Sequence, residues 1–293
     1  MRTFLMIFTA VALVVGYISA PAVADWFPED GHKMHFPQLP DPVGWDVNAS
    51  WPVVLADDWE CSQSGWVQDI HFWGSHRFDL ALPITAFDLV IYSNIPGPPS
   101  KPGEPLWVYR AYQFLTIEWG YSPQGWYNPA TGEVYPEDHF GIYQYNIFLD
   151  SLDWFWQEKG NIYWLSIAAT PMIPEFPWGW KSSVEHFMDN ATFSVDPNYF
   201  WEPLFEPLPP YEPLDLAFVI NGRGICGDVN GDGQINLSDP ICLADHYFGG
   251  SCEIDPWASD VNCDAGVNLG DAIIIAKVYF GKPGFSLNCC PSR

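Results

Sequence analysis

The sequence has little positive charge and few enzyme signatures. Among its 293 residues, 11 Lys and Arg stand against 36 Asp and Glu, which gives a net charge of −25. Nucleic acids and anionic membranes attract proteins through Lys and Arg, so this balance excludes both as direct partners. The motifs H-E-x-x-H, G-x-S-x-G and the P-loop are also missing, which removes the usual signatures of zinc peptidases, serine hydrolases and P-loop NTPases.

Cysteine is almost missing from the first 225 residues, where Cys61 stands alone. The other six lie at Cys226, Cys242, Cys252, Cys263, Cys289 and Cys290. An even number in a small exported module predicts disulfides, and the lack of a C-x-x-C pair argues against zinc. We expect Cys226 to pair with Cys289 or Cys290, which would close the two ends of the module, and Cys61 to be a buried free thiol.

Long apolar runs are missing after the N-terminus. Residues 4–18 are apolar, follow Arg2 and precede the A-x-A sequence at 22–24, which together predict a signal peptide over residues 1–24. A membrane anchor is the alternative, but the run is shorter than the roughly 20 residues that span a bilayer. We therefore expect a secreted, extracellular or cell-surface protein with no membrane span in the mature chain.

What the sequence does contain is a repeat: 22 residues from Asp228 recur 32 positions later from Asp260, with 12 of the 22 positions identical. Each copy opens with twelve residues that match a calcium loop, whose oxygen ligands come from positions 1, 3, 5, 7, 9 and 12. The expected ligands are Asp228, Asn230, Asp232, the Gln234 carbonyl, Asn236 and Asp239 in the first copy, and Asp260, Asn262, Asp264, the Gly266 carbonyl, Asn268 and Asp271 in the second. An Asp- and Asn-rich turn without a ligand is the alternative, which two complete matches in tandem disfavour. The pattern predicts two Ca²⁺ ions.

The two loops differ at position 6, where the sharp turn favours glycine. The first loop has Gly233 there and the second has Ala265, so we expect backbone strain and a weaker second site. Position 12 is Asp in both copies, and no long helix precedes either loop. Each unit is therefore half of an EF-hand, a loop followed by one helix.

The segments CGDVNGDGQINLSD and SDVNCDAGVNLGD resemble the dockerin module, over about residues 226–290. The resemblance implies two calcium ions, an antiparallel helix pair and a cohesin-type receptor on another protein. It assigns receptor contact to loop positions 10 and 11, which are Leu237, Ser238, Leu269 and Gly270, and to the exiting helices. Their apolar faces are Ile241, Leu243, Ala244, Tyr247 and Phe248 in the first copy, and Ile273, Ile274, Ile275, Val278, Tyr279 and Phe280 in the second.

Residues 25–220 have a different composition, rich in aromatics and proline, and a short linker at 221–225 joins them to the module at 226–293. Apolar runs, several of them alternating with polar residues, predict strands near 66–73, 87–93, 107–119, 141–149, 161–170 and 214–220. Turn clusters lie between them, as at 122–125 and 128–132. Many short strands with Gly- and Pro-containing turns predict an all-β sandwich or jelly roll. The phrases GWDVNASWPVVLADDWEC, VQDIHFWGS and LDLAFVI resemble an uncharacterised all-β domain of secreted proteins from environmental bacteria, a resemblance that implies no activity.

Polysaccharide is the candidate ligand of this domain, because sugar rings stack on exposed aromatic faces. The candidates are loop aromatics: Trp126, Tyr127, Trp178 and Trp180. A pair of acids for glycoside hydrolysis could come from Asp57, Asp58, Glu118, Asp150, Asp153 or Glu185, and Asp57-Asp58 could instead hold a calcium ion or cap a turn. We favour a non-catalytic component docked through the C-terminal module. A recruited polysaccharide hydrolase, or a structural surface protein whose repeats are only a calcium staple, are the alternatives.

Overall fold

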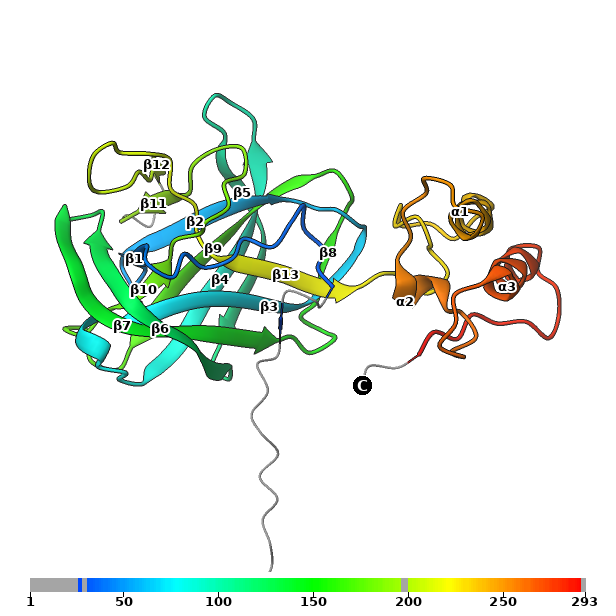
Figure 1. Ribbon diagram of the computed structural model, residues 1–293, viewed down its shortest axis with the longest axis horizontal. Helices are drawn as coiled ribbons and strands as arrows, with labels where there is room; N and C mark the ends of the chain where they lie inside the picture. Colours follow the sequence, from blue (N-terminus) through cyan, green and yellow to red (C-terminus); the bar gives the residue numbers. More distant parts are fainter. Residues whose placement is uncertain (1–25, 28–30, 196–199, 291–293) are drawn as a thin grey trace, which may run out of the picture.

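The computed structural model describes residues 26–27, 31–195 and 200–290, so the signal peptide expected at 1–24 lies outside the described residues. The chain forms two β-sheets followed by a small helical module (Figure 1). It is therefore mainly β, as the sequence predicts.

The first sheet has seven strands in the order β10-β1-β6-β7-β3-β13, with β8 beside β3. Their bounds are β1 (Trp45–Asn48), β3 (Gly65–His76), β6 (Leu115–Asn128), β7 (Glu133–Phe148), β8 (Phe155–Gln157), β10 (Trp178–Lys181) and β13 (Phe218–Arg223). β1 and β6 are parallel, and the other pairs are antiparallel. Because β10 pairs with both β1 and β3, five strands of this sheet close into a ring.

The second sheet is antiparallel, in the order β12-β11-β2-β9-β4-β5. Its strands are β2 (Val54–Glu60), β4 (Ile84–Ile95), β5 (Lys101–Ala111), β9 (Ile162–Pro171), β11 (Thr192–Ser194) and β12 (Glu202–Pro203). A single turn of 3-10 helix, η1 (Arg77–Asp79), connects β3 towards β4.

One hydrophobic core lies between the two sheets. Phe72 of β3 and Phe87 of β4 meet edge to face with ring centroids 5.0 Å apart, and Trp178 of β10 lies 5.0 Å from Phe87. All three side chains are fully buried. Aromatic side chains bury large apolar areas, and here they pack together with many buried Val, Ile and Leu residues to fill the space between the sheets.

Two local expectations were wrong. The apolar run at 107–119 is not one strand: it contains the end of β5 and the start of β6, with a turn between them. The turn expected at 122–125 lies inside β6, where the pairing with β7 shifts register between Tyr121 and Gln124 and again before Trp126. Bulges of this kind place turn-forming residues inside a strand.

The helical module contains α1 (Ser238–Tyr247), α2 (Pro256–Ser259) and α3 (Leu269–Tyr279). Disulfides join Cys226 to Cys289, Cys242 to Cys252 and Cys263 to Cys290, which confirms the expected closure of the two ends. Cys61 is free and buried, as expected, and burial raises the pKa of its thiol to about 12. In the described part of the chain, no helix has the length and apolar character needed to cross a membrane.

Candidate functional site

The two repeated loops fold in the same way around their first acidic residue. The carboxylate of Asp228 accepts hydrogen bonds from the main-chain N–H groups of Asp232 (3.1 Å) and Gly233 (2.8 Å). In the second loop, Asp260 accepts the equivalent bonds from Asp264 (3.1 Å) and Ala265 (3.0 Å). The sequence repeat is therefore a structural repeat, in which position 1 organises the turn through positions 5 and 6.

The last acidic residue of each loop closes it. Asp239 accepts hydrogen bonds from the N–H groups of Val229 (2.9 Å) and Asn236 (2.7 Å). Asp271 does the same for its own loop, from Val261 (3.2 Å) and Asn268 (3.0 Å). Position 12 thus connects the start of each loop to the start of the helix that follows.

Positions 4 and 6 of both loops have left-handed backbone conformations. Glycine occupies them in the first loop, with φ of 65° at Gly231 and 88° at Gly233. Cys263 and Ala265 occupy them in the second, with φ of 56° and 67°. A residue with a Cβ pays about 1 kcal/mol for this conformation, so the second loop is the more strained, as its sequence predicts.

The acidic groups of each loop lie near enough to affect one another's ionisation. Burial, followed by the charges of Asp239 and Asp232, raises the pKa of Asp228 to about 6. Burial also raises the pKa of Asp271, with Asp260 and Asp264 adding to the effect. Three carboxylates in one loop are a donor set that suits a hard divalent cation.

The carboxylates do not form a site by themselves. Among the described residues, no three or more His, Cys, Asp or Glu side chains are grouped as a metal site. A calcium loop also uses amide and main-chain oxygens. Asn230, Asn236 and the Gln234 carbonyl would supply them in the first loop, and Asn262, Asn268 and the Gly266 carbonyl in the second.

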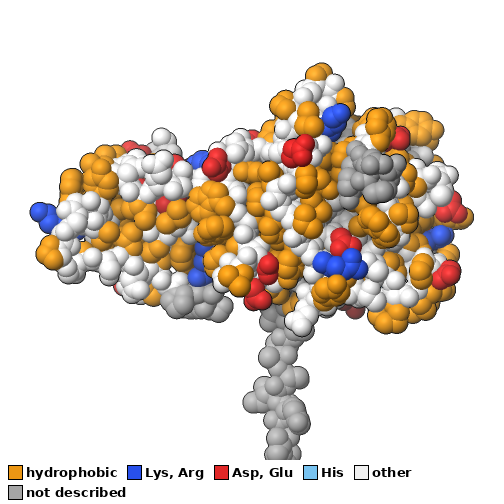
Figure 2. All heavy atoms as spheres, turned by 180° about the vertical axis from the view of Figure 1, so that it is seen from behind, with side chains coloured by type: hydrophobic (Ala, Val, Ile, Leu, Met, Phe, Trp, Pro, Cys, Tyr) orange, Lys and Arg blue, Asp and Glu red, His pale blue; other side chains and the backbone are white. Residues whose placement is uncertain are grey.

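Only part of the apolar faces expected on α1 and α3 is buried. Leu243 and Ile275 are buried in the core of the module. Equivalent residues of the two helices are exposed in pairs: Ile241 (67%) with Ile273 (53%), Tyr247 (53%) with Tyr279 (48%), and Phe248 (76%) with Phe280 (61%). Hydrophobic side chains accordingly spread over much of the module's surface when it is seen from behind (Figure 2).

The residues assigned to receptor contact lie at the starts of these helices. Leu237 directly precedes α1 and is 38% exposed, and Ser238 is the first residue of α1. Leu269 and Gly270 are the first two residues of α3. The four residues therefore occupy matching places in the two repeats.

The expected carbohydrate-stacking surface is not formed by the predicted residues. Trp178 and Trp180 are fully buried in β10, Trp126 is 1% exposed in β6, and Tyr127 is partly buried against the core. We expected Gly- and Pro-containing loops here, but these residues belong to strands at the centre of a closed sheet, so their rings point into packed protein. Buried rings offer no face to a sugar.

The candidate acids do not form an open pair around Asp57 and Asp58. Both lie inside β2 and are fully buried, so the expectation of a turn there was wrong. Asp57 accepts hydrogen bonds from Gln38 Nε2 (2.8 Å) and Leu216 N (2.6 Å), whereas neither carboxylate oxygen of Asp58 has a hydrogen-bond partner among the described residues. Burial, followed by the charges of Asp215 and Asp189, raises the pKa of Asp58 to about 9.

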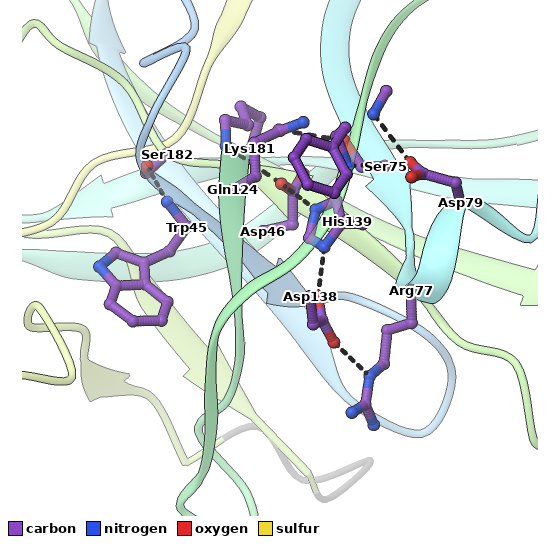
Figure 3. A network of polar contacts seen from close by, with 12 residues as sticks. Trp45, Asp46, Ser75, Arg77, Asp79, Gln124, Asp138, His139, Lys181 and Ser182 are labelled. Carbon is purple, nitrogen blue, oxygen red and sulfur yellow. Dashed lines mark hydrogen bonds and ion pairs between the residues drawn. The ribbon is translucent and has the colours of Figure 1, made fainter. Parts of the chain in front are cut away.

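A network of charged groups links three strands of the first sheet with the 3-10 turn η1 (Figure 3). His139 lies between Asp46, at 2.8 Å from its Nε2, and Asp138, which contacts its Nδ1. Lys181 Nζ reaches the same Asp46 oxygen at 3.1 Å, and Arg77 Nε lies 3.0 Å from Asp138. His139, Asp46 and Lys181 are fully buried, so this part of the network ties β1, β7 and β10 together inside the domain. The side chains at its other end, Arg77 and Asp138, are 15% and 8% exposed.

Comparisons with known proteins add a family. Searches of the curated proteins and of the solved structures found no match. The model of the family described as "Domain of unknown function (DUF7901)" matches residues 34–221, which include every strand from β1 to β12 and most of β13. The chain therefore belongs to the DUF7901 family.

Proposed function

We propose that the protein is an exported, non-catalytic component of an extracellular assembly. Its module at residues 226–293 docks in a calcium-dependent way onto a cohesin-type domain of a scaffold or surface protein, and its β domain binds polysaccharide. Three disulfides support the extracellular part of the proposal, because disulfides persist in oxidising compartments.

Calcium would be held by the two sets of loop oxygens. The carboxylates of Asp228, Asp232 and Asp239 would surround one ion, and those of Asp260, Asp264 and Asp271 the other. When bound, each ion would neutralise mutual repulsion among these acids and fix the loop that starts the following helix. The hydrogen bonds from main-chain N–H groups already hold Asp228 and Asp260 at the turn of each loop.

The observation that carries the docking proposal is the paired exposure of apolar residues on α1 and α3. A module this small buries little apolar surface, yet it leaves Ile241, Phe248, Ile273 and Phe280 more than half exposed. Exposed apolar patches on soluble proteins mark interaction surfaces. Exposed apolar residues recur at equivalent places in both helices, and Leu237 adds an exposed apolar side chain directly before α1.

The test is binding of the full chain to a panel of cohesin domains by calorimetry, with calcium and with EDTA. We expect binding that needs calcium and is lost in the double variant Ile241→Asp, Ile273→Asp. A matched control, Leu152→Asp, changes a residue of the β domain that is 97% exposed and should leave binding unchanged. Binding that persists in EDTA, or that survives the double variant, would reject calcium-dependent docking through this surface.

A further inference from the structure

Three tryptophans gather on the surface of the β domain beside the helical module. Trp66 of β3 and Trp156 of β8 are directly paired across the two strands, and their rings meet edge to face at 5.1 Å. The ring of Trp154 lies 6.4 Å from that of Trp66. Trp66 is 41% exposed, and the other two are partly buried. This cluster is an aromatic surface in solvent, unlike the buried rings of β6 and β10.

A groove runs between this surface and the first loop. Its volume is about 540 Å³. The β domain contributes Ser64, Trp156, Glu158 and Lys159, and the loop contributes Asp232, Gly233 and Gln234. Gly233 brings the loop close to the aromatic side, because a Cβ at this position would lie 3.5 Å from the Trp156 ring.

Contacts between the two parts of the chain form the groove. The main-chain N–H of Ser64 donates to the carbonyl of Gly231 at 2.9 Å, and Lys159 Nζ donates to the carbonyl of Asn230 at 3.1 Å. Lys33, buried in the β domain, donates to the carbonyl of Ser64 at 3.2 Å. The first loop therefore acts as one wall of a cleft whose other wall belongs to the β domain.

We propose that this groove and the aromatic surface beside it bind a neutral polysaccharide chain. Trp156 in the groove wall and Trp66 next to it would stack on sugar rings, and Glu158 and Gln234 would bond hydroxyl groups. Glu158 and Gln234 are both exposed, and carboxylate and amide groups accept or donate the hydrogen bonds that hydroxyls need. Clefts between domains with aromatic walls and a few polar groups are common ligand sites. The net charge of −25 disfavours an anionic polymer.

The inference rests on the proposed polysaccharide binding and assigns that binding to the groove between the β domain and the first loop. It also couples the groove to calcium, because Gln234 occupies position 7 of the first loop and Asp232 position 5. Ordering of this loop would orient the Gln234 side chain towards the aromatic wall. Retention on polysaccharide should therefore weaken when calcium is removed.

The test is affinity electrophoresis of the full chain in native gels that contain hydroxyethylcellulose, xylan or mannan, with polygalacturonate as the anionic comparison. Trp66→Ala and Trp156→Ala should each weaken retention about tenfold, the effect of one lost aromatic contact. Glu158→Ala and Gln234→Ala each remove an exposed polar side chain and should weaken retention severalfold. Trp51→Ala, which removes another tryptophan that is 53% exposed, should leave retention unchanged.

If the native chain is retained and all four variants are retained equally well, the polysaccharide binds elsewhere. That outcome would overturn the inference, while the proposed polysaccharide binding would stand. A loss of the same size in Trp51→Ala would also overturn it. Retention by polygalacturonate alone would reject the neutral ligand class. If no polysaccharide retards the native chain, polysaccharide binding itself fails, and receptor docking is judged separately by its own calorimetric test.

Discussion

The main-chain nitrogen of Ser64 lies 2.9 Å from the carbonyl oxygen of Gly231, and this hydrogen bond joins the β domain to the first of the two repeated loops. The second loop has Cys263 at the same position, tied to Cys290 by a disulfide instead. The two halves of the repeat are therefore unequal in their surroundings, although their internal hydrogen bonds match.

Gly231→Ala should loosen the contact between the two parts of the chain. The added Cβ would lie 2.5 Å from Gln63 Cγ, in addition to the cost of a left-handed φ of 65°. Gly132→Ala is the matched control, because Gly132 has a φ of 75° and open space around its Cβ position. Limited proteolysis between residues 221 and 228 should be faster in Gly231→Ala than in the control. Equal rates would show that the contact does not hold the two parts together.

Substitution of the first acidic residue of one loop should abolish calcium binding at that loop and leave the other proposed site intact. Asp228→Ala and Asp260→Ala each remove one carboxylate and the hydrogen bonds that organise one turn, so each should reduce the calcium stoichiometry from two to one in a calorimetric titration. The double variant should bind none, and EDTA should no longer lower its melting temperature. A native chain whose melting temperature is the same with calcium and with EDTA would reject both sites.

His139 should stabilise the fold in a way that depends on pH. Burial alone would lower its pKa, but the hydrogen bonds that the ring donates to Asp138 and Asp46, together with their charges, outweigh burial and raise it to about 9. A raised histidine pKa contributes stability that is complete below about 6.5, its unfolded value, and is lost as the pH rises towards 9.

His139→Gln should therefore cost the most stability at pH 6, roughly 2–4 kcal/mol for a charge removed from between two buried carboxylates. The difference from the native chain should shrink steadily up to pH 9, and urea unfolding at several pH values measures it. Stability differences that are constant over this range would contradict a charged His139.

Asp58→Asn should stabilise the protein at neutral and alkaline pH. Asp58 has a pKa raised to about 9 in the folded protein, whereas an unfolded aspartate has a pKa of about 4. The folded state therefore keeps a proton that the unfolded state releases, and the native chain loses stability as the pH rises above about 4. The amide removes that loss, and we expect a gain of about 1–3 kcal/mol near pH 8 that disappears near pH 4. Asp150→Asn, at an exposed aspartate, is the control and should change stability little. A gain that is equal at both pH values would have another cause.

The structure of the helical module could be predicted from the sequence because it contains a repeat. The same pattern occurs in two copies, so each copy supports the interpretation of the other. Asp228 and Asp260 turn out to make the same hydrogen bonds, and Cys226 pairs with one of its two expected partners. The pattern could not show which apolar side chains of the helices stay exposed. Leu243 and Tyr247 belong to the same apolar face of α1 in the sequence. The packing of α1 against α3 buries Leu243 and leaves Tyr247 exposed.

For the β domain, the sequence predicts the fold class but not which aromatic side chains are exposed at the surface. Alternation located β3, β7 and β9, but burial of an aromatic ring depends on which strands become neighbours. Trp180 is buried because β10 lies between β1 and β3, a pairing between residues far apart in the sequence. The exposure of Trp66 depends in the same way on the edge position of β8. No local signal distinguishes these two tryptophans.

The last strand of the β domain leads directly into the module that we propose as its anchor (Figure 1). β13 lies antiparallel to β3 over six residue pairs, from Phe218 with Phe72 to Arg223 with Trp66. Tension applied through an anchored module would enter the domain at Arg223 and pull β13 along its own length. Its hydrogen bonds to β3 would then be loaded in shear, all at once, rather than opened one by one. The orientation of β13 therefore sets the direction in which an anchored module would load the domain.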